Sequence, residues 1–314
     1  MEFYWDICGH EKEARFLQDT IERGNLSHGY LISGPPKIGK KRFIDHFVSS
    51  LFCLSQKKPC WKCEPCLSIK KGSFLDVEFL SLKEGEKNIS VQTVRNLISR
   101  LNYKNFSGAY KVAVIDDAEK MNKSAANCLL KTLEEPVGKT ILILSASCPE
   151  GLLPTIRSRV LEIRFKKVSQ TKIMDYLQEK GVSREQGQVW AEASHGAPGR
   201  AIDFWKNKEL FSEYQESRRK IEALFHTSLV ERFLFVDSIL EPRKAKSFLE
   251  QYIWFCRKQL MRVFMESEGS AGKPLGYGAR EWVGFLTEAE KALLCLGQNV
   301  NLKLLLQNLV LKIK

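Results

Sequence analysis

The stretch SGPPKIGKKR, residues 33–42, carries the glycine and lysine spacing of a phosphate-binding loop. In the pattern G-x-x-x-x-G-K-[ST], backbone N–H groups cradle the phosphates, the lysine pairs with them and the hydroxyl ligates Mg²⁺. Gly34, Gly39 and Lys40 fill the first three positions, and Lys41 stands where the hydroxyl belongs. The chain therefore has the residues to hold phosphate but lacks a magnesium ligand, which predicts weak or absent ATP binding.

Two adjacent carboxylates, Asp116 and Asp117, follow the apolar run Val112–Ile115. In P-loop ATPases a strand of this kind ends in an aspartate that holds Mg²⁺. Asp116 fits that role, whereas Asp117 is one methylene shorter than the glutamate expected next to it for activating water. The structural alternative is that both aspartates simply cap the following turn.

Two arginines are candidates for contact with a nucleotide. Arg159, preceded by Ser158, lies between a predicted turn and a predicted strand. It can act as an arginine finger, supplied in trans to the γ-phosphate bound by a neighbouring protein. Arg200, in GAPGRA, can sense a nucleotide. The alternative for Arg159 is a surface salt-bridge partner, and for Arg200 a cation on a helix surface. Sequence spacing alone does not decide between these interpretations.

Four of the nine cysteines are clustered as C-x6-C-x2-C-x2-C, at Cys53, Cys60, Cys63 and Cys66. Four thiolates at such spacing can close a tetrahedral structural Zn²⁺ site. An iron–sulfur cluster is the chemical alternative, but its sequence run continues with C-x3-C-P, which is missing here. Four ordinary thiols seldom cluster in this way. We therefore predict a structural zinc site.

Strand and helix patterns alternate through the first half of the chain. Apolar runs predict strands at 30–33, 77–79, 112–115, 140–144 and 160–165, and helical spacing predicts helices over 43–51, 91–101 (with Ser90 as its N-cap) and 125–133. Strands that alternate with helices are typical of a doubly wound α/β domain with a parallel sheet. The glycine loop then lies between a strand and a helix, as a P-loop requires.

After residue 165 the pattern is helical to the end. Residues 169–206 predict two or three short helices, broken at Gly181 and at 196–199, and residues from about 208 onward predict longer amphipathic helices. We expect three domains: 1–166, with the cysteine module at 53–66, then a small helical domain at 167–207, and an all-helical domain at 208–314. The Gly- and Ser-rich stretch Ser267–Gly278 predicts a flexible link.

Composition sets broad limits on this 314-residue chain. No run of 18 or more apolar residues occurs, so a membrane span is not expected, and the N-terminus has no apolar core of a signal peptide. These features predict a cytoplasmic protein. The net charge of +12 favours an anionic partner such as nucleic acid, although a merely basic soluble protein fits it as well.

The motifs together resemble one protein family. The order SHGYLISGPPKIGKKR, the four cysteines, VIDDAEKMNKSAANCLLKTLEEP and TIRSR is similar to delta-prime subunits of bacterial DNA polymerase III. These proteins belong to the clamp-loader branch of the AAA+ ATPases. KMNKSAANCLLKTLEEP is the most specific segment. The resemblance covers residues 1–205, and the helical remainder matches only in character.

The resemblance implies an architecture and a set of partners. It implies a RecA-like AAA+ domain with a zinc-binding insertion, a small helical lid and an all-α collar. Five subunits meet through their collars, so the expected partners are ATP-binding gamma/tau-type subunits and the delta subunit. The assembly opens the sliding clamp and places it on primed DNA, so both are partners through the complex. No membrane contact is implied.

The resemblance also implies roles for single residues. The family's Ser-Arg-Cys motif supplies an arginine finger in trans, and it corresponds here to Ser158-Arg159-Val160, where the last position departs but the guanidinium is kept. The four cysteines match the family's zinc module. Many delta-prime subunits have degenerate P-loops and act as stators beside an ATP-binding subunit. Together with Lys41 and Asp117, this predicts a subunit without ATPase activity of its own.

Two other functions remain open from the sequence. The chain could be a true ATPase in which Lys40, Asp116 and Asp117 work around Lys41. It could also be a zinc-dependent nucleic-acid-binding module, which would need aromatic and basic residues interleaved around the cysteines. Trp61 alone meets that requirement, so this function is the least favoured.

Overall fold

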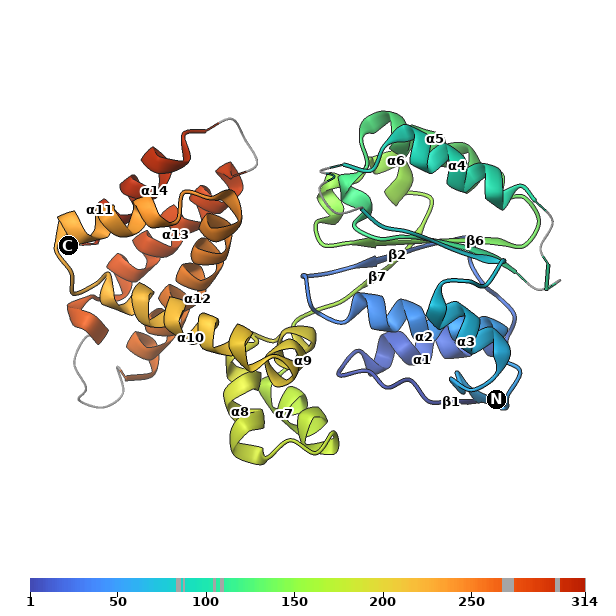
Figure 1. Cartoon of the computed structure of the whole chain (residues 1–314), viewed down its shortest axis with the longest axis horizontal. Helices are drawn as coiled ribbons and strands as arrows, with labels where there is room; N and C mark the ends of the chain where they lie inside the picture. Colours follow the sequence, from blue (N-terminus) through green and yellow to red (C-terminus); the bar gives the residue numbers. More distant parts are fainter. Residues whose placement is uncertain are drawn as a thin grey trace. The chain divides into compact units, whose positions relative to one another are not determined.

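The computed structural model divides into two compact units, Met1–Asp203 and Phe204–Lys314 (Figure 1). It describes all residues except 83–85, 87, 104–105, 108–109, 267–273, 297–299 and 314. The second unit begins near the predicted start of the last domain. Of the predicted lid, 167–207, residues 167–203 group with the sheet in the first unit. The three-domain division stays a prediction.

The first unit is built on a five-stranded parallel sheet with strand order β4-β5-β6-β2-β7. Its strands are β2 (Gly29–Ser33), β4 (Val77–Leu80), β5 (Lys111–Ile115), β6 (Thr140–Ala146) and β7 (Leu161–Arg164). Every residue of β2, β5 and β6 is buried, as expected of strands covered on both faces. The predicted parallel α/β sheet is therefore confirmed.

Helices cover both faces of this sheet (Figure 1). One face carries α1 (Glu11–Glu22), α2 (Lys40–Phe52) and α3 (Glu64–Lys71), and the other carries α4 (Val91–Leu101), α5 (Lys123–Glu134) and the one-turn α6 (Pro154–Arg157). The predicted N-cap Ser90 is confirmed, because its hydroxyl accepts a hydrogen bond from the Thr93 backbone N–H at 3.2 Å. Two 3₁₀ turns, Ala118–Lys120 and Pro149–Gly151, follow β5 and β6.

A two-stranded sheet beside the N-terminus was not predicted. It pairs β1 (Glu2–Phe3) in parallel with β3 (Lys57–Lys58). Strands of two residues are too short to show a periodic pattern in the sequence. The pairing ties the cysteine-rich segment to the start of the chain.

Three short helices follow the sheet: α7 (Gln170–Glu179), α8 (Arg184–Ala193) and α9 (Pro198–Lys206). The breaks between them fall at the predicted glycines. Ser169 and Ser183 cap α7 and α8 with their side chains, which accept hydrogen bonds from backbone N–H groups of the first turn. The prediction of short helices broken at these places is confirmed.

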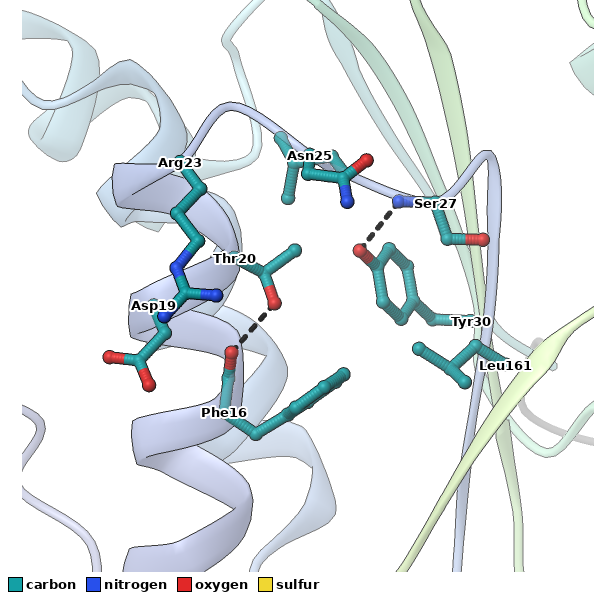
Figure 2. A pocket seen from close by; sticks show the side chains of 9 residues that line it. Phe16, Asp19, Thr20, Arg23, Asn25, Ser27, Tyr30 and Leu161 are labelled. Atoms are coloured by element: carbon teal, nitrogen blue, oxygen red, sulfur yellow. Dashed lines mark hydrogen bonds between the residues drawn. The ribbon is translucent and has the colours of Figure 1, made fainter.

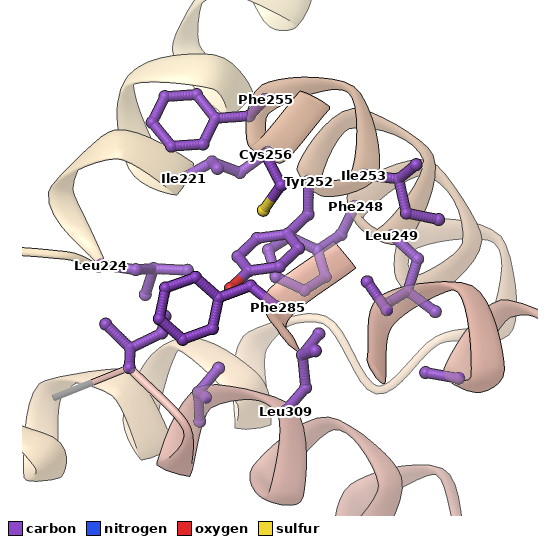
Figure 3. Packing of buried hydrophobic residues seen from close by; sticks show 14 of the residues in the cluster. Ile221, Leu224, Phe248, Leu249, Tyr252, Ile253, Phe255, Cys256, Phe285 and Leu309 are labelled. Atoms are coloured by element: carbon purple, nitrogen blue, oxygen red, sulfur yellow. The ribbon is translucent and has the colours of Figure 1, made fainter. Parts of the chain in front are cut away.

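The regular secondary structure in the described residues of the second unit is helical. Its helices are α10 (Lys208–Ala223), α11 (Leu229–Ser238), α12 (Pro242–Glu266), α13 (Ala279–Cys295) and α14 (Leu302–Leu311). Figure 3 shows their shared core, in which Tyr252, Cys256 and Leu249 of α12 lie near Phe285 of α13 and Leu309 of α14. The amphipathic faces predicted for α12 and α14 point into this core.

Two sequence expectations concern the second half of the chain. Of the predicted link Ser267–Gly278, residues 267–273 lie outside the described part, and Pro274–Gly276 form a 3₁₀ turn. Among the helices that the structure describes, none combines the length and apolar character needed to cross a membrane.

Candidate nucleotide and metal sites

The carboxyl ends of three neighbouring strands bring the predicted nucleotide residues together. β6 pairs with β2 on one side and with β5 on the other. The glycine loop follows β2, Asp116 follows β5, and Ser147 follows β6. In open parallel sheets this edge is where ligands bind. The predicted loop and Asp116 therefore lie at the same edge of the sheet.

The glycine loop has the backbone shape that its glycines permit. Gly34 and Gly39 have φ values of 145° and 107°, which side chains disfavour, and α2 begins directly at Lys40. A Cβ on Gly34 would lie 2.6 Å from the Phe165 carbonyl oxygen. The loop is thus packed against the segment that leaves β7.

The Lys40 side chain is turned into its own loop. Its Nζ donates to the carbonyl oxygens of Gly34 (2.6 Å) and Pro35 (3.1 Å) and to the Ser147 hydroxyl (3.0 Å). Burial lowers the pKa of Lys40, and the carboxylate of Glu119 opposes this effect. An ammonium has three protons to donate, so these contacts use the whole group that would otherwise pair with phosphate.

Lys41 offers no metal ligand. It is exposed in the first turn of α2, at the position where a P-loop places its hydroxyl. One helical turn later, Asp45 is half-buried, and burial raises the pKa of its carboxyl to about 6 despite the nearby charge of Lys41. Asp116 adds to this increase, and Arg42, like Lys41, opposes it. A carboxylate that is costly to ionise therefore lies one helical turn after the position of the missing hydroxyl.

The two aspartates make different contacts. The Asp116 carboxylate accepts hydrogen bonds from the Ser145 hydroxyl and from the Asp117 backbone N–H (3.2 Å). Asp117 has φ 49°, and its carboxylate pairs with Lys120 at 2.7 Å on the surface. Its side chain makes no capping hydrogen bond to the 3₁₀ turn that follows. Asp116 therefore faces the sheet edge, whereas Asp117 is committed to a surface ion pair.

The first turn of α9 lies against the glycine loop. The Gly199 backbone N–H donates to the Lys37 carbonyl oxygen at 2.8 Å, and Lys37 Nζ pairs with Asp203 at 2.9 Å. A Cβ on Gly199 would lie 2.7 Å from that carbonyl, so the approach requires glycine. Arg200 follows in the same turn, and the structure therefore places it next to the loop.

Arg159 lies elsewhere, at the corner between α6 and β7. Its Nη1 donates to the Thr155 carbonyl oxygen (3.0 Å) and to the Ser158 hydroxyl (3.3 Å). Its Nη2 pairs with Glu134 at 2.8 Å. The salt-bridge alternative from the sequence is thus observed within the chain, although the Arg159 side chain remains 37% exposed.

The four cysteines of the predicted zinc site converge. The sulfurs of Cys53, Cys60, Cys63 and Cys66 all lie within 4.8 Å of one another. Cys53 directly follows α2, and Cys63 directly precedes α3. A tetrahedral zinc with Zn–S bonds of about 2.3 Å needs sulfurs about 3.8 Å apart, so this arrangement fits the ion.

The electrostatics of the cluster also suit a cation. The Cys60 backbone N–H donates to the Cys53 sulfur, and the Cys63 N–H donates to the Cys60 sulfur, both at 3.3 Å. Hydrogen bonds from the Lys62 and Cys63 backbone lower the pKa of Cys60 to about 6. Burial raises the pKa of Cys66. A bound metal would deprotonate such thiols, and its positive charge would offset the cost of burying the Cys66 thiolate.

A hollow of about 470 Å³ opens on another part of the first unit. Figure 2 shows it between α1, the loop after α1 and β7, with the Tyr30 hydroxyl accepting a hydrogen bond from the Ser27 N–H at 2.8 Å. It is lined by Phe16, Asp19, Thr20, Arg23, Asn25, Leu26, Ser27, Tyr30 and Leu161. None of the residues predicted for the nucleotide or metal sites lines it.

Several residues that contact the predicted site residues were missed by the sequence reasoning. Ser147 binds Lys40, and its backbone N–H donates to the Glu119 carboxylate at 2.9 Å. Lys37 binds α9, and Glu134 binds Arg159. A serine directly after the buried strand TILILSA was a usable signal for Ser147. The contacts of Lys37 and Glu134 depend on tertiary packing and left no local pattern.

Comparisons with known proteins agree on one group. Residues 9–169 match the family described as DNA polymerase III, delta subunit. The delta' subunit of Pseudomonas aeruginosa DNA polymerase III is 39% identical over 142 residues, which span 45% of this chain and only 43% of that protein. The delta' subunit of Bacillus subtilis is 29% identical over 258 residues, spanning 80% and 70% of the two chains.

Similarity extends to other subunits and to a solved structure. The tau/gamma subunit of Haemophilus influenzae DNA polymerase III is 32% identical over 174 residues, covering 55% of this chain and 25% of that protein. A crystal structure of a gamma subunit-related protein from Thermotoga maritima has a TM-score of 0.51 at 19% identity, covering 96% of this chain and 98% of the other. At that identity the comparison shows a shared fold.

Proposed function

The chain belongs to the DNA polymerase III delta subunit family, and from this premise we propose that it is a clamp-loader subunit that does not hydrolyse ATP. In this role it acts as a stator beside an ATP-binding subunit. Ser158 and Arg159 form its contribution to catalysis, because Arg159 is supplied in trans to the γ-phosphate of the neighbour's ATP. Its own P-loop serves as architecture.

The observation that carries this proposal is the position of the Lys40 ammonium. In an active P-loop the lysine pairs with the β- and γ-phosphates. Here it bonds to the loop's own carbonyls and to Ser147. Binding of a triphosphate would require these bonds to break in a buried position. The absence of a hydroxyl at residue 41 then leaves Mg²⁺ without its inner-sphere protein ligand in the loop.

The contacts of α9 support the same proposal. Gly199 and Asp203 hold Lys37, which lies in the middle of the glycine loop. Loop backbone N–H groups must face the phosphates for binding. A helix seated on the loop restricts both the loop's movement and the space above it. The family's degenerate P-loops fit this closed arrangement. If nucleotide binds weakly or not at all, a nucleotide sensor at Arg200 has little bound nucleotide to contact.

The cysteine module is proposed to hold one structural Zn²⁺ through Cys53, Cys60, Cys63 and Cys66. Their convergence within 4.8 Å supports this, as do the backbone hydrogen bonds to two of the sulfurs. The metal would link the end of α2 to the start of α3. Four protein ligands leave no open coordination position, so the ion has a structural role.

The proposed partners follow from the family. They are ATP-binding gamma/tau-type subunits and the delta subunit, contacted through the sheet-bearing unit and through a collar formed by α10–α14. The sliding clamp and primed DNA are partners of the whole complex. This role in replication places the protein in the cytoplasm.

Reconstitution tests the proposal. The chain is mixed with the gamma/tau-type and delta subunits of its own organism, and the complex is isolated by size-exclusion chromatography. We expect a stable complex that contains this chain and loads the sliding clamp on primed DNA, and a mixture lacking this chain should load poorly. Failure to join the complex, or equal loading without this chain, would overturn the proposal.

A further inference from the structure

The guanidinium of Arg159 is held by its own chain on both of its terminal nitrogens. Nη1 donates to the Thr155 carbonyl oxygen at 3.0 Å and to the Ser158 hydroxyl at 3.3 Å. Nη2 pairs with the Glu134 carboxylate at 2.8 Å. Thr155 and Ser158 belong to the same corner as Arg159, whereas Glu134 is on α5. The contact with Glu134 therefore fixes the direction of Nη2.

The position of Glu134 is unusual for a carboxylate. It is the last residue of α5, where unpaired backbone carbonyls give a helix a partial negative charge. An acidic side chain is unfavourable at that end unless a cation is nearby. Lys131 in the last turn and Arg159 across the corner are both cations, and Glu134 forms its ion pair with Arg159. Stability of the helix alone thus gives no reason for a glutamate here, and its contact with Arg159 is the feature left to explain.

The ion pair is weak enough to exchange. The side chain of Arg159 is 37% exposed and that of Glu134 is 50% exposed. Exposed pairs of this kind shift an equilibrium by about fivefold at most. A γ-phosphate carries more charge than a carboxylate and accepts the same bidentate geometry from arginine. A phosphate brought to this corner can therefore displace Glu134 from Nη2.

We propose that Glu134 is a positioning residue that withholds Arg159 from the neighbouring nucleotide until the two subunits are fully engaged. This inference rests on the proposed function, since it assumes that Arg159 acts in trans. The contacts to Thr155 and Ser158 keep the guanidinium at the corner, and the Glu134 contact competes with the γ-phosphate. The consequence is a lower ATPase rate in complexes that have not bound clamp and DNA.

The test uses the reconstituted complex with Glu134→Gln, which keeps the size of the side chain and removes its charge. We expect ATP hydrolysis without clamp and DNA to rise by about two- to fivefold, the range set by the strength of an exposed pair. The rate stimulated by clamp and DNA should change little, so the stimulation ratio falls. Glu134→Asp keeps the charge and should retain most of that ratio.

Glu135→Gln is the matched control, because Glu135 is the adjacent exposed glutamate. It should behave like the wild type. An unchanged stimulation ratio in Glu134→Gln overturns the inference. A decrease in the stimulated rate also overturns it, because Glu134 would then assist Arg159 rather than withhold it.

A double variant separates this inference from the proposed function. In a background of Arg159→Ala, Glu134→Gln should have no effect, because the residue through which it acts is gone. If Arg159→Ala alone leaves ATP hydrolysis by the complex unchanged, the proposed role in trans fails, and the inference fails with it. If Arg159→Ala lowers hydrolysis while Glu134→Gln matches the wild type, the inference alone is overturned.

Discussion

The ammonium of Lys40 donates a hydrogen bond to the hydroxyl of Ser147 at 3.0 Å, joining the start of α2 to the end of β6. Together with the bond to the Gly34 carbonyl oxygen, this contact closes the glycine loop on itself. The residue that should bind phosphate is thus engaged before any nucleotide arrives. Two of the predictions below follow from this arrangement and from the helix seated on it.

The first prediction is that the isolated chain does not turn over ATP above background. Without a hydroxyl at residue 41, Mg²⁺ lacks a ligand and the charge on the transferring phosphoryl group is less neutralised. Phosphate release by the purified protein measures this. Lys41→Thr alone should not restore full activity, because Lys40 remains engaged and Asp117 remains paired with Lys120. Hydrolysis by the wild type that disappears in Lys40→Ala would refute the prediction.

The second prediction concerns Gly199. Alanine normally stabilises a helix relative to glycine by up to about 1 kcal/mol, but a Cβ here would lie 2.7 Å from the Lys37 carbonyl oxygen. We expect Gly199→Ala to lower the free energy of unfolding of the first unit by about 1–3 kcal/mol, as for other overpacked positions. Thermal or urea unfolding measures the change.

Gly284 provides the control for that substitution. It lies within α13, and a Cβ there would meet no atom within 4 Å. Gly284→Ala should be neutral or slightly stabilising. If both variants behave alike, α9 does not rest on the glycine loop as the structure has it.

The third prediction is a pH dependence caused by Asp45. Burial raises the pKa of this carboxyl from its ordinary value of 3.8 to about 6. The folded state therefore holds a proton that the unfolded state releases, and stability is lost as the pH rises from about 4 through 6. Asp45→Asn removes the ionisation, so above pH 6 it should be more stable than the wild type, by roughly 1–2 kcal/mol for a partly exposed group.

Unfolding by urea at pH 4 and at pH 7.5 measures this effect. The two proteins should have nearly equal stability at pH 4 and should differ at pH 7.5. Asp19→Asn, at an exposed position, serves as the control and should not gain stability at the higher pH. A stabilisation by Asp45→Asn that is the same at both pH values would contradict the assignment to Asp45.

The fourth prediction is that purified protein carries about one Zn²⁺ per chain. Elemental analysis measures the content, and Cys63→Ser should lower it while Cys148→Ser, an exposed cysteine outside the cluster, should not. Removal of the metal should increase hydrogen exchange mainly in residues 53–66, because the sheet has a core of its own. Iron in place of zinc, no metal in reduced protein, or global unfolding on chelation would each argue against this account.

The fold was readable from the sequence where patterns are local. Continuous apolar runs such as Val112–Ile115 predicted the buried strands, and Ser90 marked the start of a helix. The order of the strands within the sheet was not predicted, because several orders are compatible with the same alternation of strands and helices. The two-residue strands β1 and β3 were too short to show a periodic pattern of apolar residues.

The candidate site was only partly readable. Residue types and spacing pointed to Gly34, Gly39, Lys40 and the cysteines, since their chemistry depends on positions close in sequence. The closed conformation of the loop could not be predicted from the sequence, because it depends on Ser147, which lies 107 positions from Lys40. The contact between Glu134 and Arg159 likewise depends on how α5 packs beside α6, and the spacing of TIRSR carries no trace of it.

The fifth prediction tests the central claim most directly, and it is a measurement of ATP hydrolysis by the reconstituted complex with Arg159→Ala. An arginine finger is worth roughly 10³–10⁵ in rate at one site. The ATP hydrolysis rate of the whole complex should fall less, by about twofold or more, because the other sites continue to work. Melting temperature, zinc content and complex assembly should stay nearly unchanged, since an exposed ion pair contributes about 0–1 kcal/mol. Arg157→Ala, at an exposed arginine two residues away, is the control and should match the wild type. A fall in clamp- and DNA-stimulated hydrolysis with Arg159→Ala alone is the predicted result, and a wild-type rate would mean that Arg159 is a surface cation and the chain a passive scaffold.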